Sequence, residues 1–88
     1  MDKFNFSESV ELPKEYYAID KPKQYITKMI KQSAEKKGLS TRPLAEKANM
    51  KQPQLMRITT RENYTINNLL KVLDALELEI VLQPRYNK

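Results

Sequence analysis

A chain of 88 residues allows one small domain and no second independent core. Sixteen Lys and Arg oppose 11 Asp and Glu, which gives a net charge of +5, and neither Cys nor His is present. This composition excludes disulfides, thiolate or imidazole metal ligands and an imidazole base, so we expect neither an enzyme nor a bound metal or other cofactor.

Residues 1–20 form an acidic arm ahead of a basic body. The arm contains two Lys and five Asp or Glu, a net of −3, whereas residues 21–88 contain 14 Lys or Arg and six Asp or Glu, a net of +8. Because the arm lacks sustained periodicity, we expect it to be loosely packed or to form short extended pieces, which pack beside residues 78–82 or bind a partner protein. The chain has neither the apolar stretch of a signal peptide nor the ~20 apolar residues of a membrane span, and we expect a cytoplasmic protein.

A helix is predicted over residues 21–37. Asp20 is placed to cap it, and its first turn tolerates Pro22 because the first N–H groups of a helix have no partner within it. Gly38 ends the helix, since glycine adopts the left-handed conformation freely. The inward face is an apolar stripe at helical spacing, made of Ile26, Met29, Ile30 and Ala34. We expect a solvated face that carries the lysines Lys23, Lys28, Lys31, Lys36 and Lys37.

Two short helices joined by a tight turn are predicted next. Ser40 is the expected cap of the first, and Asn49 closes it because asparagine accepts the left-handed conformation better than most residues. Pro53 marks the first turn of the second helix. The inward faces of the two helices are formed by Leu44, Ala45, Ala48, Leu55 and Ile58.

A polar loop, residues 59–64, leads to a fourth helix that Thr65 caps. Its apolar stripe is the clearest in the chain and consists of Ile66, Leu69, Leu70, Leu73 and Leu76. Apolar residues then alternate as in a strand that Pro84 stops. A lone strand lacks hydrogen-bond partners, and the same strand of a second copy supplies them by two-fold antiparallel pairing. We therefore expect a homodimer whose interface contains Leu78, Ile80 and Leu82.

The two short helices and their turn match the requirements of a helix-turn-helix, so residues 21–76 are predicted to bind DNA and residues 77–85 to form the dimerisation strand. In this motif the start of the second helix reaches base edges in the major groove, where Gln pairs with adenine and Arg with guanine. The candidate base-reading residues are Gln52, Gln54 and Arg57, although Arg57 can instead clamp a phosphate. The candidate phosphate contacts are Thr41, Arg42, Lys51, Thr60, Arg61, Asn63 and Tyr64, of which Tyr64 can equally serve to pack the loop.

Residues 39–58, LSTRPLAEKANMKQPQLMRI, resemble the Xre/Cro helix-turn-helix family. Residues 65–76 resemble the next helix of that family, and residues 78–85 are similar to the C-terminal strand of HipB-like antitoxins, which pair such strands across a dimer. The resemblance covers residues 22–85 and implies a mostly α-helical, lambda-repressor-like bundle of four to five short helices with a C-terminal β-strand shared by a homodimer. The matching positions in the first segment are Leu39, Ser40, Leu44, Ala45, Ala48, Met50, Leu55 and Ile58.

Three residues depart from the family pattern. Asn49 replaces the usual Gly, and Lys51 replaces the usual Ser or Thr cap, which weakens the cap but adds a cation. Pro53 occupies a position that often reads a base, so that contact is lost or apolar. The resemblance implies groove binding at Gln52, Gln54 and Arg57 without indicating which bases are read.

The leading hypothesis is a sequence-specific transcriptional repressor that binds a palindromic DNA operator as a homodimer. The resemblance narrows it to the antitoxin and autorepressor of a toxin–antitoxin pair, with the toxin bound at the acidic arm or at a surface of the dimer. The alternative is a protein-interaction module that keeps the helical scaffold and reads no DNA, which Pro53 and the acidic arm leave open.

Overall fold

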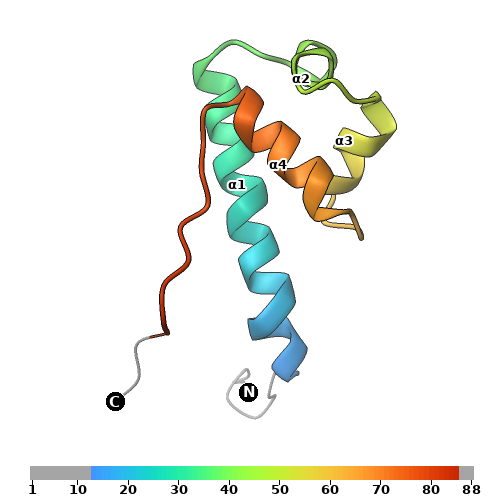
Figure 1. Cartoon of the computed structure of the whole chain (residues 1–88). Coiled ribbons are helices and arrows are strands. Elements are labelled where there is room, and N and C mark those ends of the chain that lie inside the picture. Colours follow the sequence, from blue (N-terminus) through green and yellow to red (C-terminus); the bar gives the residue numbers. More distant parts are fainter. Residues whose placement is uncertain (1–12, 86–88) are drawn as a thin grey trace, which may run out of the picture.

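The computed structural model describes residues 13–85, and this part of the chain is mostly helical (Figure 1). A π-helical turn, η1 (Tyr16–Asp20), leads into the helices α1 (Lys21–Lys36), α2 (Thr41–Lys47), α3 (Gln52–Thr59) and α4 (Ile66–Ala75). The long helix α1 forms the axis of the molecule, and the three shorter helices gather beside its C-terminal half (Figure 1). The prediction of a mostly α-helical chain is confirmed.

The residues immediately before α1 are helical rather than extended, which corrects the prediction for the end of the acidic arm. Residues 14–20 continue directly into α1, so Asp20 has helical backbone angles (φ −67°, ψ −44°) and makes no capping hydrogen bond. Tyr17 and Ile19 stay about half exposed, and because these turns bury so little, no apolar stripe marked them in the sequence. The rest of the arm, residues 1–12, lies outside the described residues.

Each of the four α-helices ends in the same backbone motif. The first residue after the C-cap has a positive φ in every case, namely Gly38 (68°), Asn49 (59°), Arg61 (63°) and Glu77 (60°). At the end of α1, Gly38 N–H donates to the Glu35 carbonyl at 3.1 Å and Leu39 N–H to the Ala34 carbonyl at 2.9 Å, which is the Schellman arrangement. The left-handed turns predicted at Gly38 and Asn49 are confirmed.

Of the three predicted capping residues, Asp20, Ser40 and Thr65, only Thr65 makes a capping hydrogen bond. Thr65 caps α4, because its Oγ1 accepts a hydrogen bond from Asn68 N–H at 3.1 Å. Ser40 occupies the cap position of α2 with extended backbone, but its side chain makes no capping hydrogen bond. Pro43 and Pro53 both lie in a first turn, where the missing N–H has no helical partner to lose.

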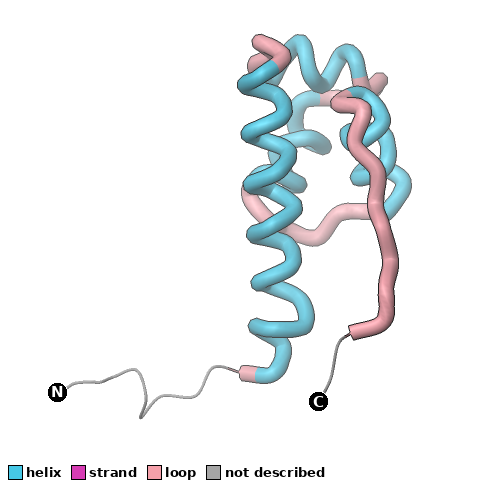
Figure 2. The backbone as a smooth tube through the Cα atoms, turned by 90° about the vertical axis from the view of Figure 1, so that its left-hand side faces the viewer, coloured by secondary structure: helices cyan, strands magenta, loops and turns pink. Residues whose placement is uncertain are grey.

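After α4 the chain runs extended alongside α1 and in the opposite direction (Figure 2). Residues 78–85 form no strand within the described part of the chain, because a β-ladder needs a neighbouring strand. Leu78 packs against the core, but the side chains of Ile80, Val81 and Leu82 are 43%, 72% and 90% exposed. The predicted strand is therefore an extended, apolar segment without a ladder in the single chain.

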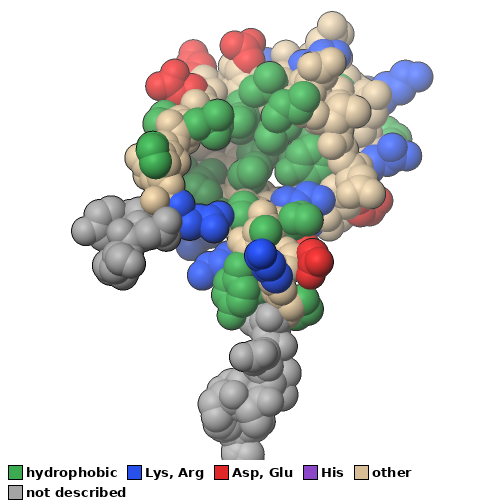
Figure 3. Space-filling view, turned by 60° about the horizontal axis from the view of Figure 1, so that its bottom comes forward, with side chains coloured by type: hydrophobic (Ala, Val, Ile, Leu, Met, Phe, Trp, Pro, Cys, Tyr) green, Lys and Arg blue, Asp and Glu red, His purple; other side chains and the backbone are tan. Residues whose placement is uncertain are grey.

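An apolar hollow of about 420 Å³ lies between this segment and the helices. Figure 3 shows hydrophobic side chains gathered around a hollow on this side of the molecule. The hollow is lined by Tyr25, Ile26 and Met29 of α1, by Leu73 of α4 and by residues 78–81.

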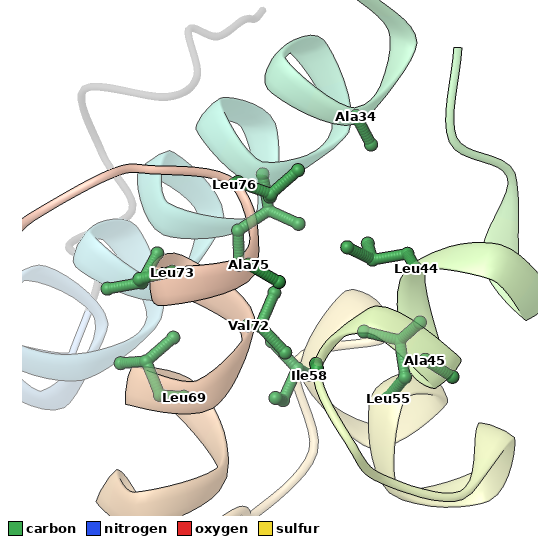
Figure 4. Close-up of a cluster of buried hydrophobic side chains, with 12 residues drawn as sticks. Ala34, Leu44, Ala45, Leu55, Ile58, Leu69, Val72, Leu73, Ala75 and Leu76 are labelled. Carbon is green, nitrogen blue, oxygen red and sulfur yellow. The ribbon is translucent and has the colours of Figure 1, made fainter. Parts of the chain in front are cut away.

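The core lies where α1, α2 and α4 meet α3 (Figure 4). Ile58 of α3 and Val72 of α4 are completely buried, and Leu55 is 1% exposed. These close-packed contacts fix the orientation of α3 relative to the other helices. The other members of the core are Ile30, Ala34, Leu44, Ala45, Ala48, Leu69, Leu73, Ala75 and Leu76.

Candidate functional site

Helix α3 buries one face and exposes the other along its whole length. Leu55 and Ile58, three residues apart, are buried, and the side chains between and before them point outward. The turn from α2 into α3 is short: Ala48 is the C-cap of α2, and Lys51 already has the extended backbone of an N-cap (φ −82°, ψ 151°). The fold therefore presents the start of α3 to solvent. The exposed residues of α3 are Gln52, Pro53 and Gln54 at its start and Met56 and Arg57 further along.

The side chain of Gln54 is engaged at the beginning of α3. Lys51 N–H donates to Gln54 Oε1 at 3.1 Å, which satisfies a helix-start donor that would otherwise be free. The ammonium of Lys51 cannot accept a bond in return, so only half of a capping box forms. The carboxamide of Gln54 consequently turns its oxygen towards the helix start. This geometry leaves the NH₂ group as the part of Gln54 that is free to donate outward.

A polar hollow of about 410 Å³ brings four of the candidate residues together. It joins Gln54 and Arg57 of the base-reading set to Asn63 and Tyr64 of the phosphate set. Its remaining lining residues are Thr65 and Asn68, and the sequence prediction included neither. Two consecutive Asn at the start of α4, residues 67 and 68, are poor helix formers, but this local feature does not indicate that Asn68 lies at the hollow.

Thr41 and Thr60 lie at a different hollow, of about 740 Å³, between α1, α2 and α3. Met56 and Thr59 line the same hollow, on another side of α3 from Arg57. The hydroxyl of Thr60 is engaged, since its Oγ1 lies 2.7 Å from the Met56 carbonyl and 2.9 Å from Glu62 Oε2. The structure thus divides the predicted contacts between two sides of α3.

Three candidate cations lie on α2 and at the two ends of α3. Arg42 is exposed on α2, where its Nε lies 3.6 Å from Glu46 Oε2, while Lys51 and Arg61 are exposed at the two ends of α3. An exposed pair such as Arg42–Glu46 contributes little in water, so a ligand anion can replace the carboxylate.

The prediction that the α1 lysines form a solvated face is wrong at Lys23, whereas Lys37 is exposed as predicted. Lys23 is half-buried, and its Nζ donates to the Glu62 carbonyl at 3.1 Å and lies 5.1 Å from the centre of the Tyr64 ring. Partial burial also raises the pKa of the Tyr64 hydroxyl above its usual value of 10.0. Lys37 pairs with Glu77, with Nζ and Oε1 3.2 Å apart.

Among residues 13–85 no group of three or more acidic side chains is placed to hold a metal ion, and no helix is long and apolar enough to cross a membrane. Comparison of the whole chain with protein-family models gives no match, and comparison with curated proteins gives none either.

Proposed function

We propose that this protein binds duplex DNA sequence-specifically through a helix-turn-helix formed by α2 and α3. The observation that carries the proposal is the orientation of α3, which buries Leu55 and Ile58 and exposes Gln52 and Gln54 at its start and Arg57 in its last turn. A recognition helix in the major groove requires such an exposed start on a firmly packed helix. The likeness of residues 39–58 to the Xre/Cro pattern supports the same function.

In this proposal the side chains on α3 read bases and their surroundings hold the DNA backbone. Gln52 is free to pair with a base, Gln54 donates from its NH₂ group, and Arg57 reaches either a base or a phosphate from the polar hollow. Asn68, which lines the polar hollow with Asn63 and Tyr64, is added to the phosphate contacts. The contacts that the sequence assigned to phosphates are Thr41, Arg42, Lys51, Thr60, Arg61, Asn63 and Tyr64.

The exposed apolar segment after α4 supports a homodimer. Leu82 is 90% exposed and Ile80 43%, an arrangement that antiparallel pairing with the segment of a second copy would cover. Leu78, Ile80 and Leu82 would then lie at the interface. Two recognition helices about 34 Å apart would enter successive major grooves on one face of a palindromic operator.

A dimer of this kind represses transcription in the cytoplasm by occupying its operator. The similarity of residues 78–85 to the C-terminal strand of HipB-like antitoxins favours an antitoxin that represses its own gene, with a toxin as the partner protein. This narrower assignment is based on the resemblance.

The test is the binding of the chain to the DNA immediately upstream of its own gene, measured by fluorescence anisotropy against a scrambled duplex at ~0.15 M salt. We expect a preference of about 10³-fold or more, as is typical of specific binders. Gln52→Ala should lower that preference by about 1–3 kcal/mol, because it removes a base contact without touching the core. Equal and weak binding to both duplexes would contradict an autorepressor.

The second candidate function is a protein-interaction module. It is favoured by two exposed apolar side chains one turn apart on α4, Ile66 at 59% and Leu70 at 47%. The two candidates differ in their response to Ala at Gln52 and Arg57. A module that binds only protein would keep its affinity for that partner in the double variant, whereas a DNA-binding protein would lose its operator.

A further inference from the structure

One stripe of α1 faces α3 and changes character along its length. Lys23, Thr27, Ile30 and Ala34 follow one another at spacings of four, three and four residues, which places them on one face of the helix. The C-terminal pair, Ile30 and Ala34, belongs to the apolar core. The N-terminal pair is polar and makes hydrogen bonds instead.

Both polar side chains of the stripe bind backbone carbonyls at the end of α3 and just beyond it. The buried Thr27 donates from Oγ1 to the Ile58 carbonyl at 3.1 Å. One turn earlier, Lys23 donates from Nζ to the Glu62 carbonyl, also at 3.1 Å. Helix α1 therefore holds the last turn of α3 through Thr27 and the loop that follows through Lys23.

The Lys23 ammonium contacts the loop on both sides of Asn63. It binds the carbonyl of Glu62 and lies 5.1 Å from the centre of the Tyr64 ring, within the range of a cation–π interaction. The loop itself is tightly turned, with a positive φ at Arg61 and a 2.8 Å hydrogen bond from Glu62 N–H to the Arg57 carbonyl. The side chain of Lys23 thus contacts the segment that carries Arg61, Asn63 and Tyr64 at two points, in addition to the backbone hydrogen bond at Glu62.

We propose that Lys23 is a positioning residue for DNA binding: it holds residues 61–64 in the geometry in which their side chains meet phosphates, while its own ammonium stays on the loop. The inference rests on the proposed function, since it assigns these loop residues to DNA. When the loop is already ordered in the free protein, binding does not incur the entropic cost of ordering it, and the affinity is higher.

The test compares Lys23→Met with Lys28→Met, which removes the same charge from an exposed position of the same helix. In the free protein, Lys23→Met should speed hydrogen exchange at Glu62 N–H relative to the core amide of Val72, and Lys28→Met should not. Operator affinity of Lys23→Met should fall about 3- to 10-fold further than that of Lys28→Met. Lys23→Arg, which keeps a hydrogen-bond donor and a cation, should retain the hydrogen-exchange rate at Glu62 N–H and the operator affinity of the unmodified chain.

The salt dependence of binding separates positioning from direct contact. A lysine that contacts a phosphate contributes about 0.9 to the slope of log K against log salt concentration, so Lys23→Met should leave that slope unchanged. Because each protomer of the proposed homodimer carries one Lys23, a slope reduced by about 2 would overturn the proposal by placing Lys23 on the DNA. Unchanged exchange at Glu62 would overturn it as well. If the unmodified chain prefers no duplex, the proposed function fails, and exchange at Glu62 still decides whether Lys23 orders the loop.

Discussion

Arg61 adopts a backbone conformation that is unfavourable for its side chain. Its φ of 63° lies in the left-handed region, which costs a residue with a Cβ about 1–2 kcal/mol, whereas Gly38 has the same conformation at the end of α1 without that cost. Arg61 also stands among the candidate phosphate contacts. Under the proposed function, a phosphate contact made by the Arg61 side chain offsets in binding the free energy that its left-handed backbone costs in folding.

Replacing Arg61 by glycine should therefore separate stability from binding. We expect Arg61→Gly to raise the free energy of unfolding by roughly 0.5–1 kcal/mol, since relief of the strain exceeds the added entropy of the unfolded chain. Operator affinity should fall because a phosphate contact is lost. Urea unfolding and fluorescence anisotropy measure the two effects.

Glu77 provides the matched control for this prediction. It has nearly the same φ, 60°, but lies at the end of α4, away from the two hollows beside α3. Glu77→Gly should also raise the free energy of unfolding, although by slightly less because its exposed ion pair with Lys37 is lost. Its operator affinity should stay the same. A loss of stability in Arg61→Gly would contradict the strain argument.

Gln54 marks the limit of what the sequence could predict at the candidate site. Its type and position indicated a base-reading residue, and the structure does place it in the hollow with Arg57. The hydrogen bond from Lys51 N–H to its Oε1 was not foreseen, because the usual capping pattern begins with Ser or Thr rather than Lys. Asn68 was missed for a related reason, since only the packing of the loop against α4 brings it to the same hollow.

At the scale of elements, the features that could be predicted were those with a local cause. The apolar stripe of α1, the Thr65 cap and the turns at Gly38 and Asn49 each follow from a few neighbouring residues. The predicted stripe of α4 is correct for its buried leucines but wrong at Ile66 and Leu70, which are 59% and 47% exposed. The π-helical turn before α1 could not be predicted, because its residues bury little and extend a helix nucleated elsewhere. The predicted strand after α4 is absent from the described residues, where no neighbouring strand is available to pair with residues 78–85.

The segment after α4 has the properties of an unpaired edge strand. Its side chains become more exposed with distance from the core, from 43% at Ile80 to 90% at Leu82. An exposed apolar edge favours pairing with another chain, and a second copy offers an identical, self-complementary edge. The segment is accordingly the element on which we expect dimerisation to depend.

Leu82→Lys tests this expectation without disturbing the monomer. Because Leu82 is almost fully exposed in the single chain, the substitution should leave the fold unchanged, whereas a buried interfacial lysine would be costly. We expect sedimentation to show monomers for Leu82→Lys at concentrations where the unmodified chain is dimeric. Gln83→Lys adds the same charge on the other face of the extended segment and should remain dimeric. A dimer that persists in Leu82→Lys would place the interface elsewhere.

At the scale of the whole molecule, the candidate cations come from separate parts of the chain. Arg42 lies on α2, Lys51 at the cap of α3 and Arg61 in the loop after α3. The packing of α3 against α1, α2 and α4 is what holds these segments around one helix. Phosphate binding should therefore depend on the folded domain. The number of phosphate contacts should be twice as large in the homodimer as in one protomer.

This arrangement predicts the salt dependence of operator binding. Three cations in each protomer give six in a dimer, and each phosphate neutralised contributes about 0.9, so the slope of log K against log salt concentration should be about −5. Affinity should then fall roughly 10³-fold between ~50 and ~200 mM salt, which anisotropy titrations at several salt concentrations can measure. A slope half as steep would indicate that a single protomer engages the DNA. A flat profile would contradict phosphate binding by these residues, because released counterions must make a cation-driven complex sensitive to salt.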